Sequence, residues 1–150
     1  MGGIDNYTSL CIHSNDTDGS QTFVASSQYE HSITPSGAVH HEVDQAKFGA
    51  SSIYFDGDND YLTINNHSAF DFGSGDFTLD AWIRVSSIPA VGRIFARGNL
   101  QSMNGCWGWG FGTTWGGGTK FNLAVFSGGS IYDYLSSAVT ISLNEWHHVA

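Results

Sequence analysis

The acidic stretch Asp56-Gly57-Asp58-Asn59-Asp60 carries a carboxylate at every second position. This spacing begins the calcium loop of EF-hands, in which alternate oxygen ligands converge on one Ca²⁺ ion. The sixth position of that loop is normally Gly and the twelfth is Glu, but here they are Tyr61 and His67. In a turn between two strands these side chains would also point to alternate faces. Turn chemistry therefore explains the stretch without a cofactor, and calcium at Asp58 and Asp60 is the alternative.

Two pairs of adjacent histidines, His40-His41 and His147-His148, look like metal ligands at first sight. Successive side chains of a β-strand project to opposite faces, so neither pair can chelate an ion by itself. We expect each pair to contain one buried, hydrogen-bonded ring and one exposed ring.

Exposed tryptophans offer a third chemistry, because the face of an aromatic ring can cover the apolar face of a pyranose sugar. Trp82 falls on the polar side of an alternating stretch, and Trp115 lies in a Gly-rich segment. These two side chains are the candidate glycan contacts. The alternative is that they belong to the core, as most tryptophans do.

Short β-strands are the elements that would position these residues. From Phe77 to Val85 apolar residues alternate with Thr, Asp, Trp and Arg, which predicts a half-buried antiparallel strand over 77–85. Segments 52–56 and 60–64 flank turn-forming residues, which predicts a hairpin. A helical turn is predicted at 67–70, and further strands at 8–13, 21–24, 30–34, 38–43, 92–96, 106–112, 119–127, 131–135, 138–141 and 146–150. This spacing predicts an all-β, antiparallel sandwich.

The segment 106–112, CWGWGFG, alternates aromatic side chains with glycines. A row of glycines in a strand suggests that another backbone or a flat ligand packs closely there. The favoured interpretation is that the aromatic side chains fill the core and the glycines relieve crowding.

Four pieces of the chain resemble the laminin-G-like, or concanavalin A-like, jelly-roll family: FGASSIYFDGDNDYL, DFGSGDFTLDAWIRV, GRIFARGN and NEWHHVA. Residues 4–34 also look like the start of such domains in bacteriophage tail and structural proteins. The resemblance covers almost the whole chain and implies a single jelly-roll domain over residues 1–150. Calcium-binding members such as the pentraxins take ligands from a loop that resembles 97–99, so Asn99 joins the candidate metal ligands and glycan contacts.

The resemblance also raises the possibility of a glycoside hydrolase. Hydrolases of this fold carry E-x-D-x-x-E on one strand, which supplies the two carboxylates that glycoside cleavage needs. Here Glu30, Glu42 and Glu145 are isolated, and no G-x-S-x-G or H-E-x-x-H motif occurs. We therefore expect no enzymatic activity.

Charge and composition exclude other classes of partner. Five Lys and Arg stand against fourteen Asp and Glu, giving a net charge of −9, which repels nucleic-acid phosphates. No apolar run approaches the ~20 residues of a membrane helix, so we expect no membrane insertion. Cys11 and Cys106 lack metal-type spacing. A disulfide is possible, but apolar neighbours predict that Cys11 is a buried, free thiol.

The sequence stops at Ala150, within the predicted strand 146–150, where the family pattern implies further strands. We expect that the domain is incomplete, being either part of a longer protein or completed by another chain. An unpaired strand edge offers backbone donors and acceptors to a neighbouring strand. The candidate interface residues are Trp146, His147, His148 and Val149, with other copies of the chain or other assembly proteins as partners.

Taken with the phage-like opening, these features predict a non-enzymatic structural or adhesion module of an extracellular or virion assembly, of the phage tail or decoration type. The alternative is a calcium-assisted, lectin-like module with glycans as partners.

Overall fold

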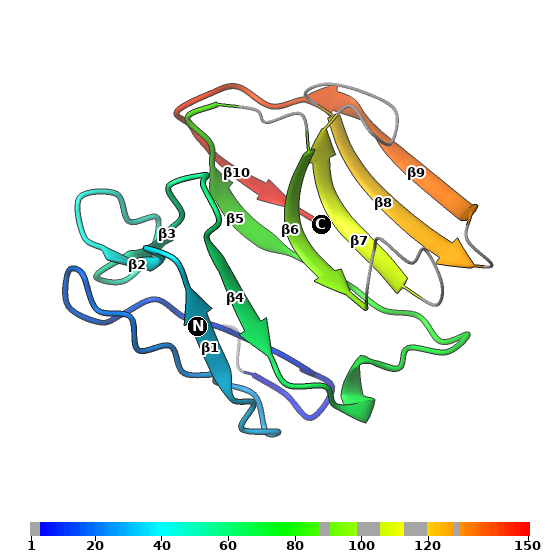
Figure 1. Ribbon diagram of the computed structural model, residues 1–150, viewed down its shortest axis with the longest axis horizontal. Coiled ribbons are helices and arrows are strands. Elements are labelled where there is room, and N and C mark those ends of the chain that lie inside the picture. The colour runs from blue at the N-terminus through cyan, green and yellow to red at the C-terminus, as the bar shows by residue number, and fades with distance from the viewer. Residues whose placement is uncertain (1–3, 88–90, 99–105, 113–119, 128–129) are drawn as a thin grey trace. The chain divides into compact units, whose positions relative to one another are not determined.

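The computed structural model describes residues 4–87, 91–98, 106–112, 120–127 and 130–150 (Figure 1). The described strands all pair antiparallel, and one 3-10 turn, η1 (Ser68–Phe70), occurs at the predicted helical turn. The all-β, antiparallel class is therefore confirmed. No helix in this part of the chain is long and apolar enough to cross a membrane. The chain divides into two compact units, Met1–Leu79 and Asp80–Ala150.

The first unit contains two separate pairs of strands. In one pair, β1 (Ile33–Ser36) lies antiparallel to β4 (Tyr61–Ile64). In the other, β2 (His40–Glu42) lies antiparallel to β3 (Ser52–Tyr54). The buried apolar side chains of this unit are Phe23, Val39 and Phe70.

The predicted hairpin between 52–56 and 60–64 is wrong, because β3 and β4 pair with different strands. The carboxylate of Asp60 accounts for the difference. Its Oδ1 accepts the backbone N–H of Ala38 at 2.6 Å, and its Oδ2 accepts that of Asp56 at 2.9 Å. Asp60 thus ties the loop before β4 to the turn between β1 and β2. In that turn Gly37 has a φ of 78°, and a Cβ there would meet Asp60 Oδ1 and lie 3.1 Å from Asn59 O.

Two predicted N-terminal strands, 8–13 and 21–24, are reduced to one bridge between Ile12 and Ala25. Cys11, which was expected to be buried, is only partly covered. A strand needs a continuous ladder of backbone bonds. Between these segments the bridge carries the bond from Ser26 N–H to Cys11 O, whereas Gly19 and Ser20 bond the backbone of His41.

The predicted strand 77–85 is shortened to β5 (Ala81–Arg84). Its first residues belong instead to a loop that closes on itself. The rings of Phe72 and Phe77 stack at 4.5 Å, and Gly75 N–H donates to Phe72 O at 3.0 Å. Phe77, expected on the dry face, is consequently 44% exposed.

The second unit contains an antiparallel meander of four strands and a separate pair, β5 with β10 (Trp146–Val149). The meander runs in the order β6 (Val91–Arg97), β7 (Cys106–Gly112), β8 (Lys120–Ser127) and β9 (Ser130–Thr140). The predicted strands 131–135 and 138–141 are therefore one continuous strand. Among the side chains of this unit that the structure describes, the buried apolar ones are Cys106, Trp109, Ala124 and Val149.

The strand β7 has the bounds predicted for CWGWGFG, and Trp109 is buried, with 7% of its surface exposed. The close approach expected at the glycines is made at Gly110 by the backbone of β6. A Cβ on Gly110 would meet Gly92 O and would lie 2.8 Å from Arg93 Cα. At this position the glycine makes room for a neighbouring strand.

Candidate functional site

One face of β5 and β10 brings together the predicted glycan contact and part of the predicted interface. In the ladder Trp82 lies opposite His148, and Arg84 lies opposite Trp146. Opposed and alternate residues of an antiparallel pair share a face. With Asp80, which contacts His148, these residues form what we call the β5–β10 face.

Trp82 lies at the centre of the β5–β10 face and is 40% exposed, as the alternation of its strand predicts. Its ring centroid is 5.3 Å from that of His148, with an angle of 33° between the planes. His148 Nε2 lies 3.7 Å from Asp80 Oδ1, and both side chains are well exposed. A flat apolar surface therefore lies beside a carboxylate and an imidazole, a combination that can stack on a sugar ring and bond its hydroxyls.

The other two predicted interface residues lie on the opposite face of this strand pair. His147 is opposite Ile83, and Val149 is opposite Ala81. Val149 is buried, with 8% exposed. Within the described ranges β10 pairs with β5 alone, so its second edge carries no strand there. The structure thus separates Trp146 and His148 from His147 and Val149, and a contact with another chain stays a prediction.

The expectation of one buried and one exposed ring holds in part: the first pair has the buried ring without an exposed partner, and the second has the exposed ring without a buried partner. His41 is buried, with 2% exposed, whereas His40 is half-buried. His148 is exposed, whereas His147 is half-buried and its Nε2–H donates to Ser142 O at 3.0 Å.

The candidate calcium ligands Asp58 and Asp60 lie in the loop before β4. Both oxygens of Asp60 already accept backbone N–H groups, and Asp58 Oδ1 accepts the Asn59 side-chain amide at 2.9 Å. In the part of the chain that the structure describes, no three His, Cys, Asp or Glu side chains are grouped to hold a metal ion. Calcium here stays a prediction, and the other two candidates, Asn99 and Trp115, lie outside the described residues.

The bonds to Asp60 predict how stability depends on pH. The N–H of Asp56, followed by that of Ala38, lowers the pKa of the Asp60 carboxyl below its ordinary value of 3.8. A lowered folded-state pKa contributes stability that is present above 3.8 and is lost as pH falls through the folded value. Asp60→Asn, which cannot ionise, should therefore lose less stability than the wild type on acidification.

Urea denaturation followed by circular dichroism from about pH 5 to about pH 2 measures this difference. The control is Asp58→Asn, which removes a carboxylate from the same loop and should keep the wild-type slope. Equal slopes for Asp60→Asn and the wild type would contradict the assignment.

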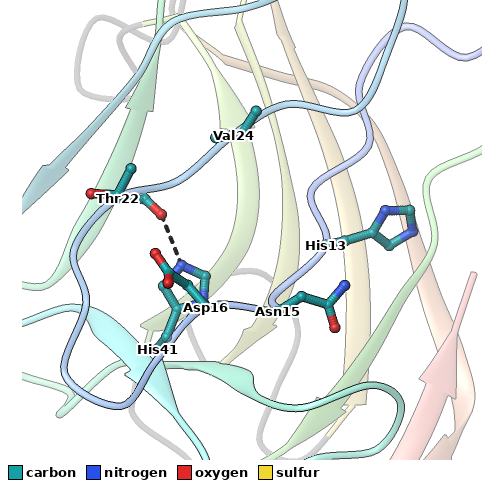
Figure 2. Close-up of a pocket in the computed structure, with 6 residues that line it drawn as sticks. All are labelled: His13, Asn15, Asp16, Thr22, Val24 and His41. Carbon is teal, nitrogen blue, oxygen red and sulfur yellow. Dashed lines mark hydrogen bonds between the residues drawn. The ribbon is translucent and has the colours of Figure 1, made fainter.

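A pocket of about 220 Å³ opens in the first unit (Figure 2). It is lined by His13, Asn15, Asp16, Thr22, Val24 and His41. Asp16 supplies its formal charge. The Ser20 hydroxyl and then the Thr17 N–H, both at 2.7 Å, hold the pKa of this carboxyl below 3.8, so it is ionised at neutral pH. None of these residues was predicted as part of a site, because they come from separate segments without a motif.

His41 forms the buried wall of this pocket. Its Nε2–H donates to Thr22 O at 2.9 Å, and its Nδ1 lies 2.6 Å from the Ser14 hydroxyl, which is hydrogen-bonding distance. The Ser51 hydroxyl lies 2.9 Å from that of Ser14 and extends the chain of bonds. The ring also stacks on Phe23, with centroids 4.6 Å apart. Every polar atom of His41 is therefore satisfied within the protein, which is the pattern of a structural histidine.

The part of the chain that carries the β5–β10 face matches the model of a known protein superfamily. The model described as the concanavalin A-like lectin/glucanases superfamily matches residues 56–150. Comparisons with curated proteins and with solved structures give no match. The matched part contains β4 to β10 and excludes the pocket residues 13–41. Because this match covers more than half of the chain, the protein belongs to the concanavalin A-like lectin/glucanase superfamily, whose fold is the antiparallel β-sandwich.

Proposed function

We propose that this chain is a non-enzymatic adhesion module of an extracellular or virion assembly that binds glycans through the β5–β10 face. The observation that carries the proposal is the exposed ring of Trp82 beside His148 and Asp80. The laminin-G-like and concanavalin A-like domains to which the chain belongs are often carbohydrate-binding or structural modules.

The chemistry of the β5–β10 face suits a polyhydroxylated ligand. The C–H face of a sugar would stack on Trp82, since stacking on a rigid aromatic ring contributes binding energy at a small entropic cost. The Asp80 carboxylate accepts hydroxyl hydrogens, while Arg84 donates N–H groups. A net charge of −9 opposes the approach of sulfated or uronic-acid polymers, so we expect a neutral glycan.

The same face favours binding over hydrolysis. Both the retaining and the inverting mechanisms use two carboxylates that flank the scissile bond. The β5–β10 face, as defined by its five residues, contains the single carboxylate Asp80.

Replacing Trp82 by alanine should lower glycan affinity about thirtyfold, the effect of losing a tryptophan contact worth about 2 kcal/mol. The melting temperature should change by only a few degrees, because the side chain is partly exposed. A glycan array identifies the ligand, and calorimetric titration of the neutral glycan that binds best measures the change. Phe55→Ala, which removes another exposed aromatic ring, is the matched control.

Unchanged affinity in Trp82→Ala, or an array without signal, would overturn the proposal. Repeating the titration with a chelator tests calcium separately. Loss of binding that added Ca²⁺ restores would support calcium assistance, whereas equal binding would exclude it and leave the glycan site intact.

A second candidate function is a structural contact between copies of this chain. It is favoured by β10, which has one strand neighbour among the described residues. The free edges of two copies could pair antiparallel across a two-fold axis. Light scattering, which measures the mass in solution, distinguishes the candidates because the structural contact requires a dimer. His148→Lys should dissociate that dimer, since it places like charges on neighbouring strand edges.

A further inference from the structure

Cys11 and His13 lie two residues apart in an extended segment, so their side chains project to the same side. Cys11 Sγ is 3.5 Å from His13 Nε2. The bridge between Ile12 and Ala25 brings Ser26 alongside, and Ser26 N–H donates to Cys11 O at 2.7 Å. The Ser26 hydroxyl lies 3.3 Å from His13 Nδ1. The fold therefore assembles a thiol, an imidazole and a hydroxyl in that order.

This order is that of a nucleophile, a base and a group that orients the base. When the Ser26 hydroxyl accepts Nδ1–H, Nε2 of His13 is left to accept the thiol proton. The thiolate is the reactive form of cysteine, and a neighbouring imidazolium stabilises it. His13 is exposed and Cys11 partly exposed, so a reagent can reach them, whereas Cys106 is 1% exposed.

The pocket of about 220 Å³ borders the imidazole of this pair, because its lining includes His13, though not Cys11. Figure 2 shows His13 on one side of the pocket and His41 on the other. Asp16 gives the wall an ionised carboxylate, and Val24 adds an apolar surface that is 67% exposed. A short chain ending in an ammonium group matches this combination by charge and size.

We propose that Cys11 is a modification site that forms mixed disulfides with small, amine-bearing disulfides, with His13 as its base. The Cys11 thiol gives its proton to His13 Nε2, and the resulting thiolate attacks one sulfur of the reagent. A new S–S bond forms as the S–S bond of the reagent breaks. The released thiolate takes the proton back from His13, so Cys11 is oxidised to the mixed disulfide and the leaving half is reduced to a thiol.

The probe is cystamine, and the protein is the full chain carrying Cys106→Ser so that one thiol remains. Intact mass follows adduct formation with time, and peptide mapping locates the adduct on Cys11. At about pH 6.5 the chain should react roughly tenfold faster than its His13→Gln variant, and the two rates should converge near about pH 9, where an ordinary thiol ionises unaided. His40→Gln, which removes a histidine bonded to Ala38 O, should leave the rate unchanged.

The pH–rate profile of the Cys106→Ser chain is a test that needs no change at His13. A midpoint well below about 8.5 supports the thiol–imidazole pair, whereas a midpoint at that ordinary thiol value overturns it. Equal rates for His13→Gln at every pH would also overturn it. An anionic disulfide of similar size should react more slowly than cystamine, and equal rates would refute the role of Asp16 in the pocket.

Discussion

Replacing His41 by alanine is expected to lower the free energy of unfolding of the first unit by about 3–5 kcal/mol. The substitution removes a fully buried ring and opens a cavity against Phe23. It also leaves Thr22 O without its ring donor and removes one of the two bonds of the Ser14 hydroxyl, which keeps its contact with Ser51. A buried polar group that loses its partner costs about 1–3 kcal/mol, so the cavity and the lost bonds act in the same direction.

Far-ultraviolet circular dichroism in urea measures this loss, because the tryptophans at 82, 107, 109, 115 and 146 all lie outside the first unit. The control is the adjacent His40→Ala. His40 is half-buried and bonds Ala38 O, so we expect a change of at most about 1 kcal/mol. A His41→Ala chain as stable as His40→Ala would show that the bond chain through Ser14 and Ser51 does not stabilise the unit.

Two-residue periodicity predicted the strands best where pairing is local. The segment 106–112 has the predicted bounds because β6, β7 and β8 follow one another in the sequence and pair as neighbours. The same alternation predicted that Trp82 would be exposed. In these strands each side chain's environment follows from its position in a regular ladder.

The predictions failed where one side chain bonds a distant backbone group. The hairpin expected across Gly57-Asp58-Asn59 is replaced by two separate pairings because Asp60 bonds Ala38, 22 residues earlier. Turn residues indicate that the chain reverses there, and both Gly57 and Asn59 have positive φ. They carry no information about which strand the chain pairs with afterwards.

The candidate sites divide in the same way. Alternation placed Trp82 on an exposed face, but only the pairing of β5 with β10 brings His148 beside it. The spacing of Cys11 and His13 is a signal in the sequence for a thiol–imidazole pair. Ser26 joins them through a single bridge that no local pattern predicts.

Gly110→Ala is expected to destabilise the second unit by about 3 kcal/mol or more. Gly110 lies in the central part of the meander, where β6 has an irregular register between Arg93 and Phe95. The added Cβ would meet Gly92 O and would lie 2.8 Å from Arg93 Cα. These are backbone atoms, so no change of rotamer can relieve the overlap. The overlap can be relieved only if β6 moves away from β7 and loses backbone bonds to it.

Tryptophan fluorescence in guanidinium measures this effect, since Trp107 and Trp109 lie on the same strand as Gly110. Gly75→Ala is the matched control: its nearest contact would be Phe72 O at 3.4 Å, which is ordinary packing, and its backbone does not have a positive φ. This control should be neutral or slightly stabilising, because alanine reduces the entropy of the unfolded chain. If Gly110→Ala unfolds at the wild-type midpoint, β6 and β7 must be further apart than their close approach at Gly92 implies. The glycines of this strand would then be explained by turn or folding requirements, and packing between neighbouring backbones would not be their cause.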